Sequence, residues 1–173
     1  MKKALFFFFL SISIAVNAQV NADYLKEINR DIWLPFIEAY GSLNTEKYKS
    51  LQTDDFIRAE GNGKRLPTHK DYFENVDVWF SDVKKDKQKL SINFRFIERF
   101  ANDKVASERG IYELITFDAA GKELWKGYGK FHVFMRKINN VWKIVVDYDS
   151  NENKTIDEKT YLGAFAMDDF EKY

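Results

Sequence analysis

The sequence contains no cysteine, only two prolines and only two histidines. The absence of cysteine excludes disulfides, thiol catalysis and cysteine-based zinc sites, so the domain must be stabilised by a hydrophobic core. The two histidines, His69 and His132, lie far apart in the sequence and do not predict a metal site on their own. We therefore expect no metal and no other cofactor.

An excess of charge of one sign is also missing. The chain has 27 basic and 27 acidic side chains, so its formal net charge is zero. A nucleic-acid-binding domain would need a basic face, and we therefore expect no nucleic-acid partner. Aromatic residues, in contrast, make up 17% of the chain, which is enough to build a core without disulfides.

Residues 1–18 have the three-part pattern of a secretory signal peptide. Met1-Lys2-Lys3 is basic, an apolar run from Ala4 to Val16 follows, and Val16-Asn17-Ala18 places aliphatic and small residues before a cleavage site. The apolar run is shorter than the ~20 residues that span a bilayer. The pattern predicts export to the periplasm or the medium, without membrane attachment after cleavage. An uncleaved membrane anchor is the alternative.

The remaining chain is expected to form one α+β domain over residues 19–150, followed by a C-terminal amphipathic helix over 151–173 that packs on the same domain. Helical spacing of apolar residues predicts helices over 22–42 (kinked or broken at Pro35), 45–51, 68–85 and 157–173. Alternating and β-branched residues predict a short strand at 55–59 and an antiparallel meander of strands at 89–101, 104–117, 122–137 and 141–149.

This order of elements, with three packing motifs, resembles the NTF2-like (SnoaL-like) cone fold. The motifs are Trp33 to Tyr40 (WLPFIEAY), Gly129 to Phe134 (GKFHVF) and Val141 to Val145 (VWKIV). The resemblance implies a curved sheet that wraps around helices and leaves a pocket. The family includes isomerases, dehydratases, polyketide cyclases, ligand binders and interaction modules, so the fold alone does not select a function.

Strand alternation assigns side chains to the two faces of the sheet, on the assumption that no β-bulge interrupts the register. A two-residue turn at Asn139-Asn140 pairs Met135 with Ile144, Val133 with Val146 and Phe131 with Tyr148. The turn at Asn102-Asp103 pairs Arg95 with Gly110. Helical residues close the pocket, and Asp55 and Arg58 lie near its mouth. The candidate ligand-binding residues are Trp33, Tyr40, Asp55, Arg58, Tyr72, Trp79, Asn93, Arg95, Tyr112, Trp125 and Tyr148.

These residues support three interpretations. In the first, the cone binds a small, largely apolar molecule. In the second, the protein is an isomerase, dehydratase or cyclase that uses Asp55, Arg95 and Tyr112 or Tyr148 as acid, base and oxyanion groups. The resemblance implies that acid and base residues project into the cone, yet this register places Val133, Met135 and Tyr148 there. In the third, the cone is a filled aromatic core and the protein is an interaction module.

The opposite face of the sheet mixes apolar and charged residues, which suits a homodimer contact or a seat for the C-terminal helix. The apolar positions are Ile92, Phe94, Phe96, Ile111, Ile115, Leu124 and Phe134. On this face His132 lies opposite Asp147, either as a catalytic base with its orienting carboxylate or as an ordinary cross-strand pair. Residues 147–158 partly imitate a calcium-binding loop, but Glu152 replaces the required glycine, and an Asn/Asp-rich strand exit is the better interpretation.

Overall fold

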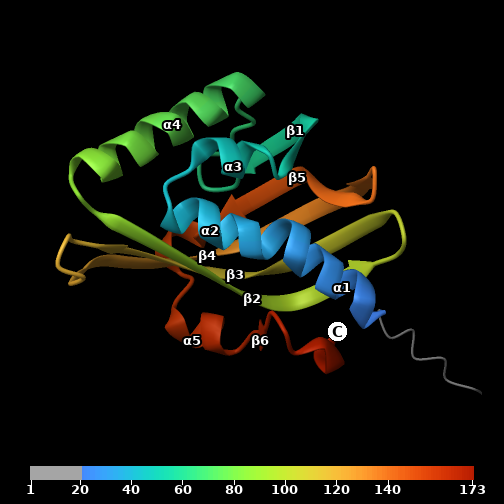
Figure 1. The fold of residues 1–173 in the computed structure, drawn as a ribbon. Helices are drawn as coiled ribbons and strands as arrows, with labels where there is room; N and C mark the ends of the chain where they lie inside the picture. Colours follow the sequence, from blue (N-terminus) through green and yellow to red (C-terminus); the bar gives the residue numbers. More distant parts are fainter. Residues whose placement is uncertain (1–20) are drawn as a thin grey trace, which may run out of the picture.

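The structure is a computed structural model that describes residues 21–173. The expected signal peptide at residues 1–18 lies outside this range. Helices α1 to α4 cover one face of a curved six-stranded sheet, and the C-terminal segment runs along the β2 edge of the sheet (Figure 1). The predicted α+β class is confirmed.

The N-terminal helical segment is continuous from α1 (Ala22–Ile28) through a π-helical turn, η1 (Asn29–Trp33), to α2 (Leu34–Gly41). Pro35, for which a kink or break was predicted, lies in the first turn of α2. The N–H of Leu34 bonds to the carbonyl of Asn29, five residues earlier. The wider π turn directly before Pro35 accommodates a residue that has no N–H to donate, so the helix continues.

Side-chain caps set the start of the next helices. Asn44 accepts a hydrogen bond from the Lys47 N–H at 2.9 Å and begins α3 (Thr45–Lys49). Thr68 accepts from the Asp71 N–H at 3.1 Å and begins α4 (His69–Lys85), as the sequence predicts. Between these helices, β1 (Gln52–Glu60) extends beyond the predicted strand at both ends.

Gly41, the last residue of α2, is expected to tolerate alanine with a gain in stability. No heavy atom lies within 4 Å of the position that its Cβ would occupy. Alanine has the higher helix propensity and restricts the unfolded chain, so Gly41→Ala should raise the free energy of unfolding by about 0.5–1 kcal/mol. Gly121, with φ at 88°, is the control: Gly121→Ala should lower it by about 1 kcal/mol. Urea denaturation measures both, and a loss of stability in Gly41→Ala would contradict this account.

Four long strands follow within one or two residues of their predicted bounds: β2 (Lys89–Ala101), β3 (Val105–Phe117), β4 (Glu123–Ile138) and β5 (Val141–Ser150). The order in the sheet is β1-β5-β4-β3-β2-β6. The strands β2 to β5 form the predicted antiparallel meander, but β1 pairs with β5 in parallel. The sheet is therefore mixed rather than antiparallel.

A β-bulge shifts the register of the β4–β5 hairpin. The two-residue turn is correct, since Asn139 and Asn140 both have positive φ, and Met135 pairs with Ile144 as predicted. The next pair, however, is Phe134 with Val146, which leaves Val145 as an extra residue in β5. Every side chain of β5 beyond this point lies on the face opposite to the predicted one.

The first consequence is that Val133 pairs with Asp147 and Phe131 with Asp149, so the predicted partners Val146 and Tyr148 are wrong. Asp147 and Asp149 point to the concave face. Tyr148 points to the outer face and is 40% exposed.

The register of β2 also shifts, between Phe96 and Glu98. Phe96 pairs with Gly110, where the bulge-free register placed Arg95. The assignment of the two faces of β2 is therefore reversed over its first half: Ile92, Phe94 and Phe96 are buried in the main core, and Asn93 and Arg95 lie on the outer face.

The C-terminal segment does not form the single amphipathic helix predicted for 157–173. It consists of a 3₁₀ turn η2 (Glu152–Lys154), a short helix α5 (Glu158–Leu162), a two-residue strand β6 (Phe165–Ala166) on the edge of β2, and a final turn η3 (Phe170–Lys172). Its apolar residues pack against two different surfaces. Ile156 and Ala164 pack on Ile111 at the outer face, whereas Phe170 and Tyr173 pack on the main core. One straight helix cannot reach both.

The core contains a buried ion pair that joins β2 and β3. The side chains of Arg99 and Glu108 are 0% exposed, with Arg99 Nε at 2.8 Å from Glu108 Oε1. Trp33 donates to the other carboxylate oxygen at 2.5 Å. Arg99 also donates to Asn29 Oδ1 at 2.6 Å and to the Met167 carbonyl at 2.9 Å. This network joins the N-terminal helix, the sheet and the C-terminal segment.

Candidate functional site

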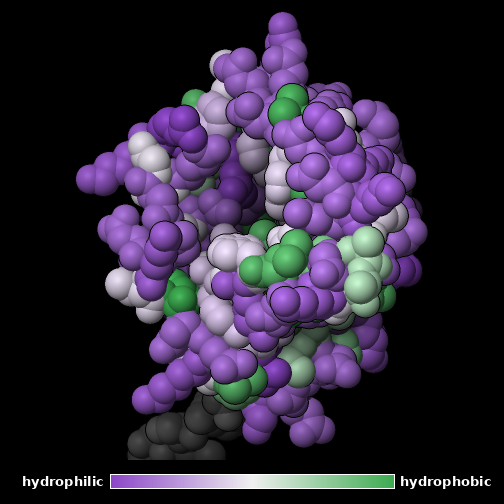
Figure 2. Space-filling view, turned by 90° about the vertical axis from the view of Figure 1, so that its left-hand side faces the viewer, coloured by the Kyte–Doolittle hydropathy of each residue, from purple (hydrophilic) through white to green (hydrophobic). Residues whose placement is uncertain are grey.

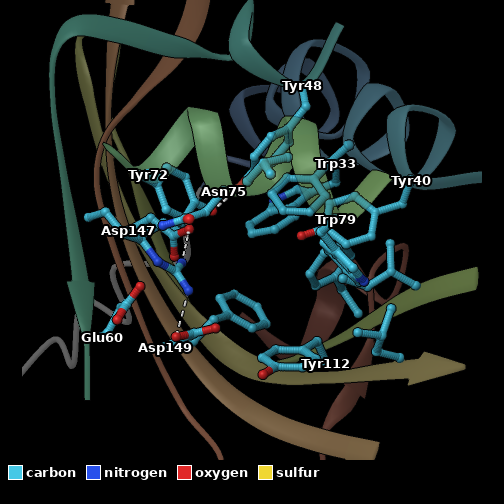
Figure 3. Close-up of a pocket in the computed structure, with 18 residues that line it drawn as sticks. Trp33, Tyr40, Tyr48, Glu60, Tyr72, Asn75, Trp79, Tyr112, Asp147 and Asp149 are labelled. Atoms are coloured by element: carbon cyan, nitrogen blue, oxygen red, sulfur yellow. Dashed lines mark hydrogen bonds and ion pairs between the residues drawn. The ribbon is translucent and has the colours of Figure 1, made fainter. Parts of the chain in front are cut away.

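A cavity of about 260 Å³ lies between the helices and the concave face of the sheet (Figure 3). Figure 2 shows a hollow in this face of the molecule, with hydrophilic residues in its depth. The volume is just below the ~300 Å³ at which ligand pockets commonly begin. Eighteen residues border the cavity: Trp33, Phe36, Tyr40, Tyr48, Arg58, Glu60, Tyr72, Asn75, Val76, Trp79, Ile92, Phe94, Tyr112, Leu114, Phe131, Val133, Asp147 and Asp149.

Half of these residues are aromatic and come from both layers of the fold. Trp33 on the N-terminal helix lies 4.7 Å from Phe94 and 5.1 Å from Phe131 between ring centroids. Tyr40 meets the Trp79 ring of α4 edge to face at 5.7 Å. Such contacts hold the rings in fixed orientations, so the walls of the cavity are preorganised.

A charged cluster forms one side of the cavity. Arg58 on β1 donates through Nη1 to Asp147 Oδ2 at 2.5 Å and through Nη2 to Asp149 Oδ1 at 2.6 Å. Its guanidinium carbon lies 5.1 Å from the centre of the Tyr72 ring. The hydroxyls of Tyr72 and Tyr48 are hydrogen-bonded at 2.6 Å. The parallel pairing of β1 with β5 places Arg58 opposite Asp147 and so creates this cluster.

Burial dominates the proton affinities in the cluster. It raises the pKa of Asp147, although Arg58 opposes this effect. Burial also raises the pKa of Tyr72 to about 12, and it raises that of Tyr112, with the Asp149 carboxylate adding to the rise. At neutral pH both tyrosines are therefore neutral and present hydroxyl groups. The cavity thus combines an apolar wall, neutral phenols and carboxylates.

Six of the eleven predicted ligand-binding residues border this cavity: Trp33, Tyr40, Arg58, Tyr72, Trp79 and Tyr112. Five do not: Asp55, Asn93, Arg95, Trp125 and Tyr148. The carboxylate of Asp55 is 69% exposed and pairs with Arg136. Trp125 stands near the β3–β4 hairpin and is 53% exposed.

Bulges explain the misplacement of Asn93, Arg95 and Tyr148, all three of which lie on the outer face. Asn93 donates to Glu113 at 3.3 Å, and Arg95 donates to the Ala164 carbonyl at 2.8 Å. Asp55, Arg95 and Tyr148 therefore do not border the cavity in which the predicted enzyme mechanism would use them.

The residues that sequence reasoning missed include the most polar part of the site: Asp147, Asp149 and Glu60. The alternation of Asp147-Tyr148-Asp149 was visible and put both carboxylates on one face, but the bulge at Val145 decided which face. Acidic side chains thus do project into the cone. Of the three positions expected to point inward, Val133 and Met135 do so, whereas Tyr148 does not.

The predicted pairing of His132 with Asp147 is wrong. His132 pairs with Tyr148 on the ladder, and its Nε2 lies 2.9 Å from Ser107 Oγ on the outer face. Burial and the nearby Arg109 lower its pKa. Since Asp147 points to the opposite face, the two side chains cannot act together.

The loop after β5 contains a turn capped by its own side chain. Asn151 Oδ1 accepts from the Lys154 N–H at 3.1 Å, and residues 152–154 all have positive φ. Across residues 21–173 no group of three or more His, Asp or Glu side chains is arranged to hold a metal ion.

Comparisons with known proteins identify the architecture. No family model and no curated protein sequence matches the chain, but solved structures do. The domain has the NTF2-like fold. An NTF2-like protein of unknown function from Shewanella oneidensis MR-1 superposes with a TM-score of 0.56 and 16% identity, over 72% of this chain and 97% of that one.

An NTF2-like protein of unknown function from Pseudomonas putida KT2440 gives a TM-score of 0.54 at 12% identity, over 82% of this chain and 94% of its own. An uncharacterized protein with a cystatin-like fold from Caulobacter vibrioides gives 0.55 at 8% identity, over 76% and 96%. At these identities the likeness concerns the fold of the NTF2-like domain and no activity. Within the part of the NTF2-like domain that the structure describes, no helix has the length and apolar character needed to cross a membrane.

Proposed function

We propose that this NTF2-like domain is exported and binds a small organic molecule with a largely apolar body in its cavity. The observation that carries the proposal is the cavity itself, with aromatic walls and a polar cluster gathered on one side. An apolar pocket with a few converging polar groups is the usual form of a small-molecule site. The signal-peptide pattern of residues 1–18 supports export.

The test is native mass spectrometry of the protein purified from the envelope of its own host, followed by identification of the released molecule. We expect a stoichiometric small compound. Leu114→Trp should abolish it, since Leu114 borders the cavity and an indole would occupy the space. Ile115→Trp is the matched control, because the neighbouring side chain of a strand points to the opposite face. Protein that is empty, or an undiminished ligand in Leu114→Trp, would overturn the proposal.

A second candidate is an isomerase-, dehydratase- or cyclase-type enzyme. The observation that favours it is that Asp149 and Tyr112 both border the cavity, where a carboxylate could accept a proton and a phenol could donate one. Incubation of the loaded protein in deuterated water separates the candidates. Deuterium on a carbon of the released compound would favour the enzyme, and a compound without it would favour binding alone.

The homodimer also stays a proposal. Exposed apolar side chains on the outer side of the sheet support it, among them Ile57 (50% exposed) and Phe134 (47%). The same native spectra give the mass of the assembly, and a monomer at micromolar concentration would contradict it.

A further inference from the structure

The side chains of charged residue types that border the cavity are predominantly acidic. They are Asp147, Asp149 and Glu60, with Arg58 as the single base. Glu60 has an outside partner in Arg65, whose side chain is 72% exposed. With Glu60 counted as neutralised, the cavity still carries one more negative than positive charge. A ligand that enters it therefore meets a negative potential.

The charge of Arg58 is already balanced by two carboxylates. Its two terminal nitrogens are engaged by Asp147 and Asp149, it stacks on the Tyr72 ring, and its side chain is only 11% exposed. Its Nε has no hydrogen-bond partner among residues 21–173, but this atom is buried. Asp149, in contrast, is 28% exposed, four times as much as Asp147 at 7%. An anionic ligand would lie against carboxylates rather than against the guanidinium, so the site disfavours it.

Nine aromatic rings supply most of the remaining wall, and their faces are also electronegative. Tyr40 and Trp79 lie across the cavity from the carboxylates, and Tyr112 lies beside Asp149 (Figure 3). A cation within about 6 Å of such ring faces is attracted by their quadrupoles, and Trp is the strongest partner. Organic ammonium groups are recognised in this way because their alkyl substituents are apolar and their charge is spread.

We propose that the ligand of this cavity is an organic amine or quaternary ammonium compound, whose cationic group lies between the Asp149 carboxylate and the aromatic faces of Trp79 and Tyr112. The inference rests on the proposed binding function and adds the charge of the ligand to it. The apolar remainder of the molecule packs along the partly buried Leu114 and the buried rings of Phe94 and Phe131.

Two probes of equal shape test whether the cavity prefers a positively charged ligand. They are para-trimethylammoniophenol and para-tert-butylphenol, which differ only in a positively charged nitrogen in place of a carbon. Titration calorimetry on the wild-type protein is carried out at a pH where both phenols stay uncharged at the hydroxyl. We expect the cation to bind at least about tenfold more tightly than its neutral isostere. Equal affinities, or tighter binding of the neutral compound, would overturn the inference and leave the proposed function standing.

If neither phenol binds and no compound is extracted from the native protein, the binding function itself fails, so the two failures are distinguishable. A substitution tests whether Asp149 is the carboxylate that binds the cation. Asp149→Asn should weaken binding of the cationic probe about tenfold and change the affinity of the neutral isostere by less than about twofold. Asp55→Asn is the control, because it also removes one negative charge but at a position on β1 that lies outside the cavity. It should change neither affinity. A loss of cation affinity in Asp55→Asn equal to that in Asp149→Asn would show a general effect of net charge and overturn the assignment to this site.

Discussion

Replacing Glu108 by glutamine will lower the free energy of unfolding by about 3–5 kcal/mol. The substitution keeps the shape of the side chain and removes only its charge. Arg99 is then left as a fully buried guanidinium without its counter-ion, and no solvent reaches it, since both side chains are 0% exposed. The loss is large because the remaining charge is desolvated without compensation.

The molecule contains its own control for this experiment. Glu98 and Arg109 occupy the neighbouring position on the same β2–β3 ladder, but on the outer face, where their side chains are 39% and 49% exposed. Glu98→Gln removes the same charge from a pair with the same strand connection. Because water screens that pair, the expected loss is below about 1 kcal/mol.

Urea denaturation of both variants measures the difference. Similar losses in Glu108→Gln and Glu98→Gln would contradict the argument from burial. Glu108→Gln should also loosen the C-terminal segment, because Arg99 holds the Met167 carbonyl. Hydrogen exchange of residues 164–173 should therefore become faster in Glu108→Gln and stay unchanged in Glu98→Gln.

Replacing Arg58 by methionine will lower the free energy of unfolding by about 3 kcal/mol at neutral pH. Methionine retains much of the apolar stem, but Asp147 and Asp149 then share one side of the cavity without a counter-ion. Asp147 is nearly buried, and burial already raises its pKa above the usual 3.8 against the effect of Arg58. Without Arg58 the pKa of Asp147 must rise further.

This deficit has a defined pH dependence. A carboxyl with a raised pKa in the folded state takes up its proton more readily there than in the unfolded chain. Its destabilisation is therefore largest above the raised pKa, and it is absent below the pKa of the unfolded chain, about 4. The gap between wild type and Arg58→Met should be widest near neutral pH and should narrow as the pH falls toward 4.

Denaturation of both proteins at a series of pH values tests this prediction. Asp147→Asn added to Arg58→Met removes the buried charge, so the double variant should recover stability at neutral pH and lose the pH dependence. A deficit that is constant with pH would show that the contribution of Arg58 is packing on Tyr72 rather than charge.

The local structure of the chain was predictable from local signals. The bounds of β2 and the Thr68 cap of α4 follow from residue types within a few positions of each other. The cavity-lining residues on the helices were predictable for the same reason. Trp33, Tyr40, Tyr72 and Trp79 lie on helical stripes that must face the sheet.

The polar residues of the site were less predictable, because their orientation depends on bulges. One extra residue at Val145 turns Asp147 and Asp149 inward, and a second irregularity near Ile97 turns Arg95 outward. Neither position carries a glycine or another residue that marks a bulge in the sequence. The alternation of residues along a strand shows which side chains share a face of the sheet. One extra residue at a bulge moves all the following side chains to the opposite face.

The sequence by itself therefore determined the α+β class, the order of the elements and the aromatic stripes of the helices, since these depend on neighbours along the chain. Only the tertiary structure decided that β1 lies parallel to β5, that Arg58 meets Asp147 and Asp149, and that Arg99 meets Glu108. The C-terminal residues were likewise divided between two surfaces rather than wound into one helix. Each of these features depends on which apolar side chains must be buried, and which charged side chains must be paired, once the sheet is curved. Such contacts join residues that are distant in the sequence, so they leave no periodic pattern in it.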